Sequence, residues 1–252
     1  MKRILARDSR ELLAQLASAR VLLSFDFDGT LAPICANRDD AAMRPETMRL
    51  LAQVANAFPV AVISGRARDD VASRLGVAAV KYVIGNHGLE PGGDLGAFAA
   101  EMQQAQPLLV ASLGDVQGID VEDKRYSLAI HYRRSRNKRA ARVAIDRAVR
   151  ALPSPMRVVL GKLVVNIVPE RAPDKGDALL DLREREGAST ALYVGDDVTD
   201  EDVFRLDQPG RLISVRVGES ASTSAKYFLR DQGEIDLLLA RLCELRPEGS
   251  AR

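Results

Sequence analysis

The sequence lacks several features that mark membrane, secreted and thiolate-metal proteins. Cysteine occurs only at Cys35 and Cys243, which are far apart and show neither metal-type nor redox-type pairing. No segment approaches the roughly 18 to 20 uninterrupted apolar residues of a membrane span. The charged stretch 1–20 has no apolar run of the kind found in signal peptides. We therefore expect a soluble protein of the reducing cytoplasm, with no membrane partner.

An excess of charge of one sign is also lacking. The 36 lysines and arginines are balanced by 35 aspartates and glutamates, so the overall charge gives no reason to expect nucleic acid as a partner. The basic run "RRSRNKR" at 133–139 has no interleaved aromatic residues and is interpreted as a solvated loop and helix start. A small molecule is the favoured ligand class.

Hydrophobic residues, in contrast, are plentiful and regularly spaced. They make up 46% of the 252 residues, enough for one large or two smaller domains with filled cores. Short apolar segments alternate with helical patterns at both ends of the chain, and this order predicts an α/β fold with a parallel sheet and right-handed crossovers. The expected strands of this sheet are 20–26, 59–65, 81–86, 191–195 and 211–218.

The expected helices and strands follow a different order in the middle of the chain. Its order is helix, two strands, helix and two strands, with Gly161-Lys162 as the turn of the last hairpin. That order is typical of an α+β module with antiparallel pairing. We predict a discontinuous α/β core, 1–96 and 170–252, with a smaller α+β domain inserted at 97–169. The tail 246–252 is predicted to be disordered.

Charged and hydroxyl residues follow the expected core strands or open the helix after them. Because ligands of open α/β sheets bind beyond the carboxyl ends of the strands, these residues should converge at one edge. Converging carboxylates repel one another unless a divalent cation neutralises them, and hard oxygen ligands suit Mg²⁺. The residues are Asp26, Asp28, Ser64, Lys175, Asp196, Asp197 and Asp200.

A cation, a hydroxyl and an ammonium group around a carboxylate form a site for a phosphoryl group. Asp26 can attack phosphorus and form an aspartyl phosphate while the surrounding donors hold the phosphoryl oxygens. Asp28, two residues further on, can protonate the leaving oxygen and then deprotonate the water that hydrolyses the intermediate. The alternative interpretation is a purely structural role, in which Asp26 and Asp28 only form a turn after a strand.

Four stretches resemble the motifs of the haloacid dehalogenase (HAD) superfamily of phosphatases. They are "DFDGTLAP", "VISGR", "PDKG" and "GDDVTDEDVF", in that order. Within the superfamily, "GNHGLE" at 85–90 and "VEDKRYSLAIHYR" at 121–133 resemble trehalose-6-phosphate phosphatases. The resemblance implies a Rossmann-like HAD core with a C2-type cap that closes over a sugar. The implied activity is Mg²⁺-dependent hydrolysis of trehalose-6-phosphate in trehalose biosynthesis.

The resemblance also implies roles for individual residues. Asp26 is the implied nucleophile and Asp28 the general acid/base, whose carbonyl also contacts Mg²⁺. The implied metal group is Asp26, Asp28, Asp196, Asp197 and Asp200, with the last two binding metal, its waters or Lys175. The implied phosphate contacts are Thr30, Ser64, Gly65 and Lys175, and the implied substrate contacts are Arg66, His87, Glu90, Glu122, Lys124 and Asn166.

One departure from the family pattern affects the expected substrate. The family usually has a glutamate and an arginine where this chain has Asn166 and Val168. The substrate could therefore be another glycosyl phosphate, such as glucosylglycerol phosphate, mannosyl-3-phosphoglycerate or sucrose-6-phosphate. Because there is no tryptophan, we expect sugar recognition by hydrogen bonds. A phospho-acceptor domain or a sugar-phosphate sensor without turnover is the alternative of another class. The sequence does not set the oligomeric state, and a monomer is favoured.

Overall fold

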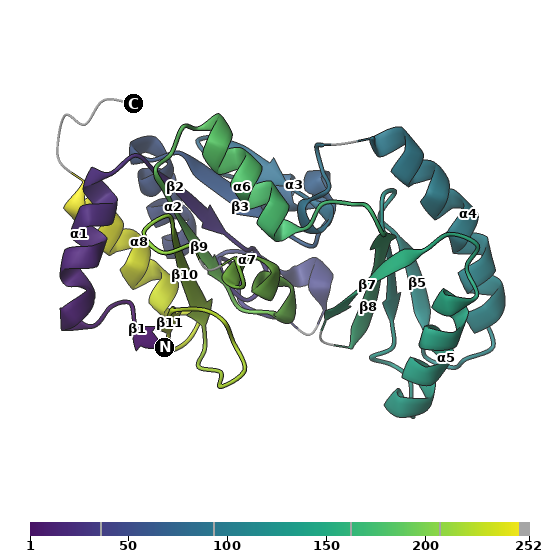
Figure 1. The fold of residues 1–252 in the computed structure, drawn as a ribbon. Coiled ribbons are helices and arrows are strands. Elements are labelled where there is room, and N and C mark those ends of the chain that lie inside the picture. The colour runs from purple at the N-terminus through teal and green to yellow at the C-terminus, as the bar shows by residue number, and fades with distance from the viewer. Residues whose placement is uncertain (36, 93, 162, 207, 247–252) are drawn as a thin grey trace. The chain divides into compact units, whose positions relative to one another are not determined.

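The chain folds into two compact units. The structure is a computed structural model, and it describes residues 1–35, 37–92, 94–161, 163–206 and 208–246 (Figure 1). The first unit combines Met1–Gly88 with Asp174–Arg252, and the second is Leu89–Pro173. The expected tail 246–252 lies outside the described residues except for Arg246, and so does Lys162 of the expected hairpin turn.

The first unit is built on a parallel sheet of seven strands. Their order across the sheet is β1-β11-β10-β9-β2-β3-β4, and every neighbouring pair is parallel. The predicted α/β fold class is thereby confirmed. The strands are β1 (Lys2–Arg3), β2 (Val21–Phe25), β3 (Val60–Ile63), β4 (Tyr82–Ile84), β9 (Thr190–Gly195), β10 (Leu212–Val217) and β11 (Tyr227–Leu229).

Helices cover both faces of this sheet. Successive side chains of a strand point to opposite faces, so a strand buried on both sides is continuously apolar, as in "VLLSF" of β2. Leu23 and Phe25 join the core under α1, α2, α3 and α8, whereas Leu22 joins the core under α6 and α7. The helices are α1 (Arg10–Ser18), α2 (Pro45–Ala57), α3 (Arg68–Leu75), α6 (Lys175–Arg185), α7 (Glu201–Phe204) and α8 (Glu234–Leu245).

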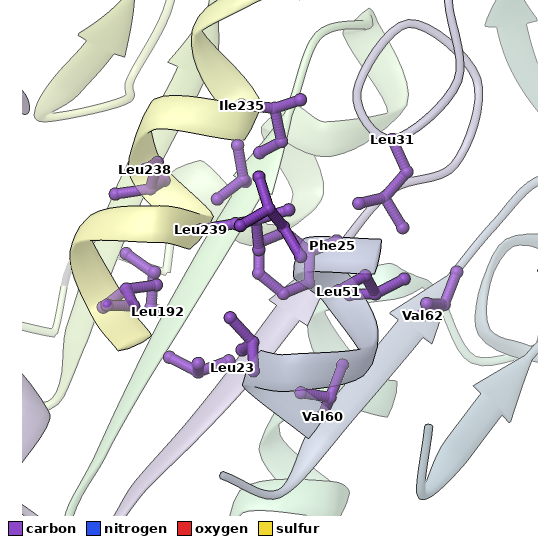
Figure 2. Close-up of a cluster of buried hydrophobic side chains, with 14 of the residues drawn as sticks. Leu23, Phe25, Leu31, Leu51, Val60, Val62, Leu192, Ile235, Leu238 and Leu239 are labelled. Carbon is purple, nitrogen blue, oxygen red and sulfur yellow. The ribbon is translucent and has the colours of Figure 1, made fainter. Parts of the chain in front are cut away.

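The larger core cluster packs α2 and α8 against the middle strands. Pro45 at the first position of α2 presets its backbone for a helix and needs no N–H partner there. Figure 2 shows Leu51 of α2 and Leu239 of α8 beside Phe25 of β2, and all three are fully buried. Burying such side chains contributes about 1.5 to 3 kcal/mol each relative to exposing them. This packing supports β2, the strand that Asp26 follows.

Two short strands were not predicted from the sequence. β1 has two residues and β11 has three, so neither shows a hydrophobic period, and both depend on contacts from elsewhere. The carboxylate of Glu234, 4% exposed, accepts hydrogen bonds from the Arg3 side chain, from the Arg230 backbone N–H at 2.9 Å and from Arg230 Nε at 2.6 Å. Glu234 therefore ties β1 and the segment after β11 to the start of α8.

The second unit has an antiparallel sheet of four strands in the order β5-β6-β8-β7. Two helices cover one face, where Leu128, Ile130, Val165 and Ile167 form the core with them. The predicted antiparallel module is confirmed as a second sheet. Its elements are α4 (Leu95–Leu113), β5 (Asp120–Asp123), β6 (Leu128–His131), α5 (Lys138–Arg150), β7 (Met156–Gly161) and β8 (Val164–Pro169).

Within the described parts of the chain, no helix combines the length and the apolar character that crossing a bilayer requires.

Glu234→Gln should destabilise the protein in a pH-dependent way. Burial alone would raise the pKa of Glu234, but hydrogen bonds from Arg3 and Arg230 outweigh it and lower the pKa. The stabilisation is therefore complete above the ordinary carboxyl pKa and is lost as the pH falls through the lowered value. We expect a loss of about 1 to 3 kcal/mol at pH 7 by urea denaturation, shrinking below about pH 4.

The control for this prediction is Glu46→Gln, which breaks an exposed pair with Arg49 and should leave stability nearly unchanged. A Glu234→Gln deficit of constant size from pH 7 to pH 3 would contradict the ionic role.

Candidate active site

The carboxyl ends of four neighbouring strands bring the candidate residues to one edge of the parallel sheet. Asp26 and Asp28 follow β2, Ser64 follows β3, His87 lies in the short helix η3 (Asn86–Gly88) after β4, and Asp196 follows β9. Asp200 ends the short helix η4 (Val198–Asp200), and Lys175 is the first residue of α6. Residues far apart in the sequence therefore lie together, as expected from parallel topology.

Lys175 is the centre of this group. Its Nζ donates to Asp26 Oδ1 at 2.9 Å and to Asp200 Oδ1 at 2.8 Å. The three residues are 1%, 5% and 0% exposed. The side chain of Asp174 caps the helix that Lys175 begins. A buried ammonium at a helix N-terminus is opposed by the helix dipole, so these two carboxylates are what hold it there.

Burial sets the proton affinities of the charged groups. Burial alone would lower the pKa of Lys175, but Asp200 and Asp26 outweigh it and raise the pKa well above its ordinary value. Burial also raises the pKa of Asp26, with Lys175 opposing and Asp200 reinforcing the shift. Burial, reinforced by Asp200 and Asp197, raises the pKa of Asp196 to about 7. The carboxylates at this edge thus raise one another's pKa values, as expected where negative groups crowd together.

The acidic group fits a bound metal ion. Asp26, Asp196 and Asp200 each offer a carboxylate oxygen, and these oxygens lie within 4.8 Å of one another. Asp196 Oδ1 is buried and has no hydrogen-bond partner among the described residues. A Cβ on Gly29, whose φ is +83°, would lie 2.2 Å from Asp196 Oδ2, so only glycine lets the loop after Asp28 approach this carboxylate. An unpartnered, buried carboxylate oxygen suits a hard cation.

Asp200 has a different part in the group. Its Oδ1 accepts from Lys175 Nζ and from Tyr193 OH at 2.7 Å, and its Oδ2 accepts from the backbone N–H groups of Asp196 at 2.8 Å and Asp197 at 2.9 Å. A carboxylate has about four lone-pair sites. All four are used here, so Asp200 organises the loop and Lys175, while Asp26 and Asp196 keep oxygens for a cation.

Asp28 lies at a more solvent-exposed place than Asp26. Its side chain is 41% exposed, against 7% for Asp26. Both of its oxygens accept from Arg66, Oδ2 from Nε and Oδ1 from Nη2, each at 2.7 Å. Arg66 was expected from the family resemblance to contact substrate, and here it contacts Asp28.

The expected phosphate contacts are buried beside this group. Ser64 is fully buried, and its Oγ accepts from the backbone N–H of Arg66 at 3.2 Å. Thr30 is also fully buried, and no described residue bonds its Oγ1. A Cβ on Gly65 would lie 2.4 Å from the ring of His87, so this glycine allows His87 to pack over the turn. His87 has a φ of +59°, a backbone conformation that costs energy and is often found at functional sites.

The expected sugar contacts of the second unit lie on one face of its sheet. Glu122 Oε2 lies 2.9 Å from His131 Nε2, and Lys124 Nζ lies 3.3 Å from Asn166 Oδ1. Strand register places Glu122 and Asn166 opposite Ala129, on the same side. This face lies opposite the core that Leu128 and Ile130 form with α4 and α5, and Asn166 on it is buried. Glu90, the last expected contact, also belongs to the second unit, at its beginning, and is half-buried.

Two residues of the site were not predicted. Tyr193 is fully buried in β9, and its hydroxyl donates to Asp200. A tyrosine in a continuously apolar strand is a usable signal, because its buried hydroxyl requires a partner. Gln232 Nε2 donates to the carbonyls of Thr30 at 3.0 Å and Leu31 at 3.2 Å, fixing the loop after Asp28. The sequence around Gln232 carries no signal for this contact.

Comparison with known proteins agrees with the geometry. The sequence model of the family described as trehalose-phosphatase matches residues 24–233. The chain belongs to the trehalose-phosphatase family. The matched range includes all the candidate residues of both units, from Asp26 to Asp200. The relatives below carry the name of a phosphoric monoester hydrolase, so this is a family of enzymes.

Individual relatives differ in how much of them the chain spans. It is 30% identical to probable trehalose-phosphate phosphatase 4 of Oryza sativa subsp. japonica, over 96% of this chain and 71% of that protein. It is 36% identical to trehalose-phosphate phosphatase of Mycobacterium avium, over 80% of this chain and 55% of that protein. The C-terminal domain of Candida albicans trehalose-6-phosphate phosphatase has the same fold, with a TM-score of 0.78, 22% identity and coverage of 93% of this chain and 96% of that chain.

Tyr193→Phe should destabilise the trehalose-phosphatase core. The change leaves the ring in place but removes one donor from the buried carboxylate of Asp200, which is bonded to Lys175. We expect a loss of about 1 to 3 kcal/mol in the free energy of unfolding by urea denaturation. Tyr227→Phe, in a half-buried tyrosine of the same sheet, is the matched control. Equal stability of Tyr193→Phe and wild type would show that Tyr193 does not hold Asp200.

Proposed function

We propose that this chain is a Mg²⁺-dependent phosphatase that hydrolyses trehalose-6-phosphate to trehalose and phosphate. The observation that carries the proposal is the buried Asp26, hydrogen-bonded to Lys175 and grouped with Asp196 at the edge of the parallel sheet. A carboxylate fixed beside an ammonium and a cation site is suited to attack phosphorus. Family membership supports the substrate class.

Asp26 and Asp196 would hold the metal ion, which when bound offsets the charge of the phosphoryl oxygens and of the carboxylates. Asp200 keeps Lys175 in place and leaves Lys175 Nζ beside Asp26 Oδ1. Lys175 then holds a phosphoryl oxygen while it orients the nucleophile. The hydroxyl groups of Ser64 and Thr30 and the backbone of Gly65 are the proposed further donors.

The chemistry proceeds in two displacements at phosphorus. In the first, a carboxylate oxygen of Asp26 bonds to phosphorus, the bond from phosphorus to the sugar oxygen breaks, and Asp28 gives its proton to that oxygen. In the second, Asp28 takes a proton from water, the water oxygen bonds to phosphorus, and the carboxylate of Asp26 leaves. Asp28 is two residues from Asp26 and partly exposed, which suits a group that meets both the sugar oxygen and water.

The sugar contacts are proposed on separate grounds. Glu122, Lys124 and Asn166 present an acid, an ammonium and an amide on the face of the second unit's sheet opposite Leu128 and Ile130. Charged and amide groups can hydrogen-bond the hydroxyls of a sugar without aromatic stacking. We propose that they bind the trehalose part of the substrate, together with His87 and Glu90.

A second candidate substrate rests on Asn166. Asn166 Oδ1 lies 3.3 Å from Lys124 Nζ, and Asn166 Nδ2 donates to the carbonyl of Val159 at 3.4 Å. The glutamate usual in the family would give Lys124 a charged partner, so the amide leaves it a weaker one. Another glycosyl phosphate with a different second group is therefore the runner-up.

The test is phosphate release from a substrate panel. The panel holds trehalose-6-phosphate, sucrose-6-phosphate, glucosylglycerol phosphate, mannosyl-3-phosphoglycerate and glucose-6-phosphate, each with Mg²⁺ and with chelator. We expect preference for trehalose-6-phosphate, loss of activity with chelator, and no turnover by Asp26→Asn. Preference for another compound would change the proposed substrate but not the proposed chemistry. Absence of release from every compound would contradict a phosphatase.

Lys124→Ala should damage turnover of the disaccharide phosphate much more than that of p-nitrophenyl phosphate. Contacts to the sugar contribute only when a sugar is present, whereas the phosphoryl contacts serve both substrates. We expect a loss of about 10-fold or more in kcat/KM for trehalose-6-phosphate. Arg139→Ala, at an exposed position of α5, is the control in the same unit. Equal losses on both substrates would show that Lys124 supports the fold.

A further inference from the structure

Arg66 is bound to Asp28 through two hydrogen bonds. Nε and Nη2 of its guanidinium donate to the two different oxygens of Asp28, both at 2.7 Å. This is the bidentate arrangement in which two parallel hydrogen bonds fix the plane as well as the position of a carboxylate. Asp28 itself is 41% exposed, so without such a partner its side chain would sample several rotamers.

Further hydrogen bonds hold the guanidinium of Arg66 itself in place. Nη1 donates to Asp70 Oδ2 at 2.8 Å, and Nη2 also donates to the carbonyl of Arg38 at 2.7 Å. Arg66 is 8% exposed, and its guanidinium lies 5.8 Å from the centre of the Phe27 ring. Asp70 is in turn held by Arg74 Nε at 2.7 Å. The arginine is therefore a rigid support and not a mobile surface cation.

These contacts leave Arg66 little capacity to bind a substrate. A guanidinium has five N–H donors, and four hydrogen bonds to Asp28, Asp70 and the carbonyl of Arg38 are already made. At most one N–H, on Nη1, is left for a phosphoryl or sugar group, and a bidentate contact with substrate would have to displace one of the two carboxylates. This contrasts with the substrate contact expected for Arg66 from the family resemblance.

We propose that Arg66 is a positioning residue that fixes the orientation of the Asp28 carboxylate for proton transfer. The proposal rests on the proposed function, in which Asp28 first gives a proton to the sugar oxygen and then takes one from water. Both transfers require the same carboxylate at the same place beside phosphorus. A displacement of about 1 Å can cost about 100-fold in rate. The two hydrogen bonds from Arg66 would prevent such a displacement of the Asp28 carboxylate.

The test combines a substitution of Arg66 with a substitution of Asp28. Arg66→Gln should lower kcat for trehalose-6-phosphate by about 10- to 100-fold and leave KM within about threefold. A substrate-binding arginine would instead raise KM with little change in kcat. That result would overturn the proposal.

A double-mutant cycle separates positioning from general support of the fold. Turnover of p-nitrophenyl phosphate is measured for wild type, Arg66→Gln, Asp28→Asn and the double variant. Because p-nitrophenolate is a good leaving group, the variants without Asp28 should still turn over at a measurable rate. If Arg66 acts through Asp28, Arg66→Gln lowers the rate when Asp28 is present and adds almost nothing to Asp28→Asn. If Arg66→Gln lowered the rate by the same factor with Asp28 and with Asn at that position, the proposal would be overturned.

Arg49→Gln is the matched control. Arg49 pairs with Glu46 on the exposed side of α2 and takes no part in the hydrogen bonds around Asp28, Arg66 and Asp70. Its effect, whatever the size, should be the same in both backgrounds. If Arg66→Gln proves unstable by thermal denaturation, Arg66→Lys serves in its place, because lysine keeps the charge and loses the fork. Failure of the proposed function would show differently, as a wild-type protein that releases no phosphate from either substrate.

Discussion

The buried ion pair of Lys175 with Asp26 and Asp200 is the interaction on which the rest of the site depends. An ammonium in the interior is costly unless carboxylates and hydrogen bonds surround it. Here Lys175 Nζ lies within 2.9 Å of Asp26 and 2.8 Å of Asp200, and Tyr193 and two backbone N–H groups satisfy Asp200 in turn. The pair also brings together three segments, the end of β2, the start of α6 and the loop after β9.

That arrangement divides the acids by task. Asp200 already accepts four hydrogen bonds, so its first task is to hold Lys175 and the loop after β9. Asp26 is oriented by one bond from Lys175, and Asp196 keeps a buried oxygen that no described residue bonds. Asp28 is turned toward Arg66 and solvent. The proposed nucleophile, cation site and proton-transfer group, and the aspartate that organises them, thus come from one cluster of aspartates with different neighbours.

The sequence predicted the parts of this structure that depend on local pattern. The apolar runs of β2 and β9 and the acids after them predicted both the parallel sheet and the edge where the residues meet. β1 and β11 were missed, because strands of two and three residues have no period of their own. The contacts of Arg66 with Asp28 and of Tyr193 with Asp200 were missed as well. Side-chain direction between distant segments depends on packing and cannot be obtained from spacing along the chain.

The most direct test of the account is to trap the phosphoryl group on the protein. Wild type and Asp28→Asn would be mixed with trehalose-6-phosphate and Mg²⁺, quenched in acid and mapped by mass spectrometry of peptides. We predict an acid-stable phosphoryl group on Asp26, more abundant in Asp28→Asn when hydrolysis of the intermediate slows more than its formation. Phosphate release by wild type with no phosphoryl group on Asp26 in either protein, or with the group on another residue, would contradict the account.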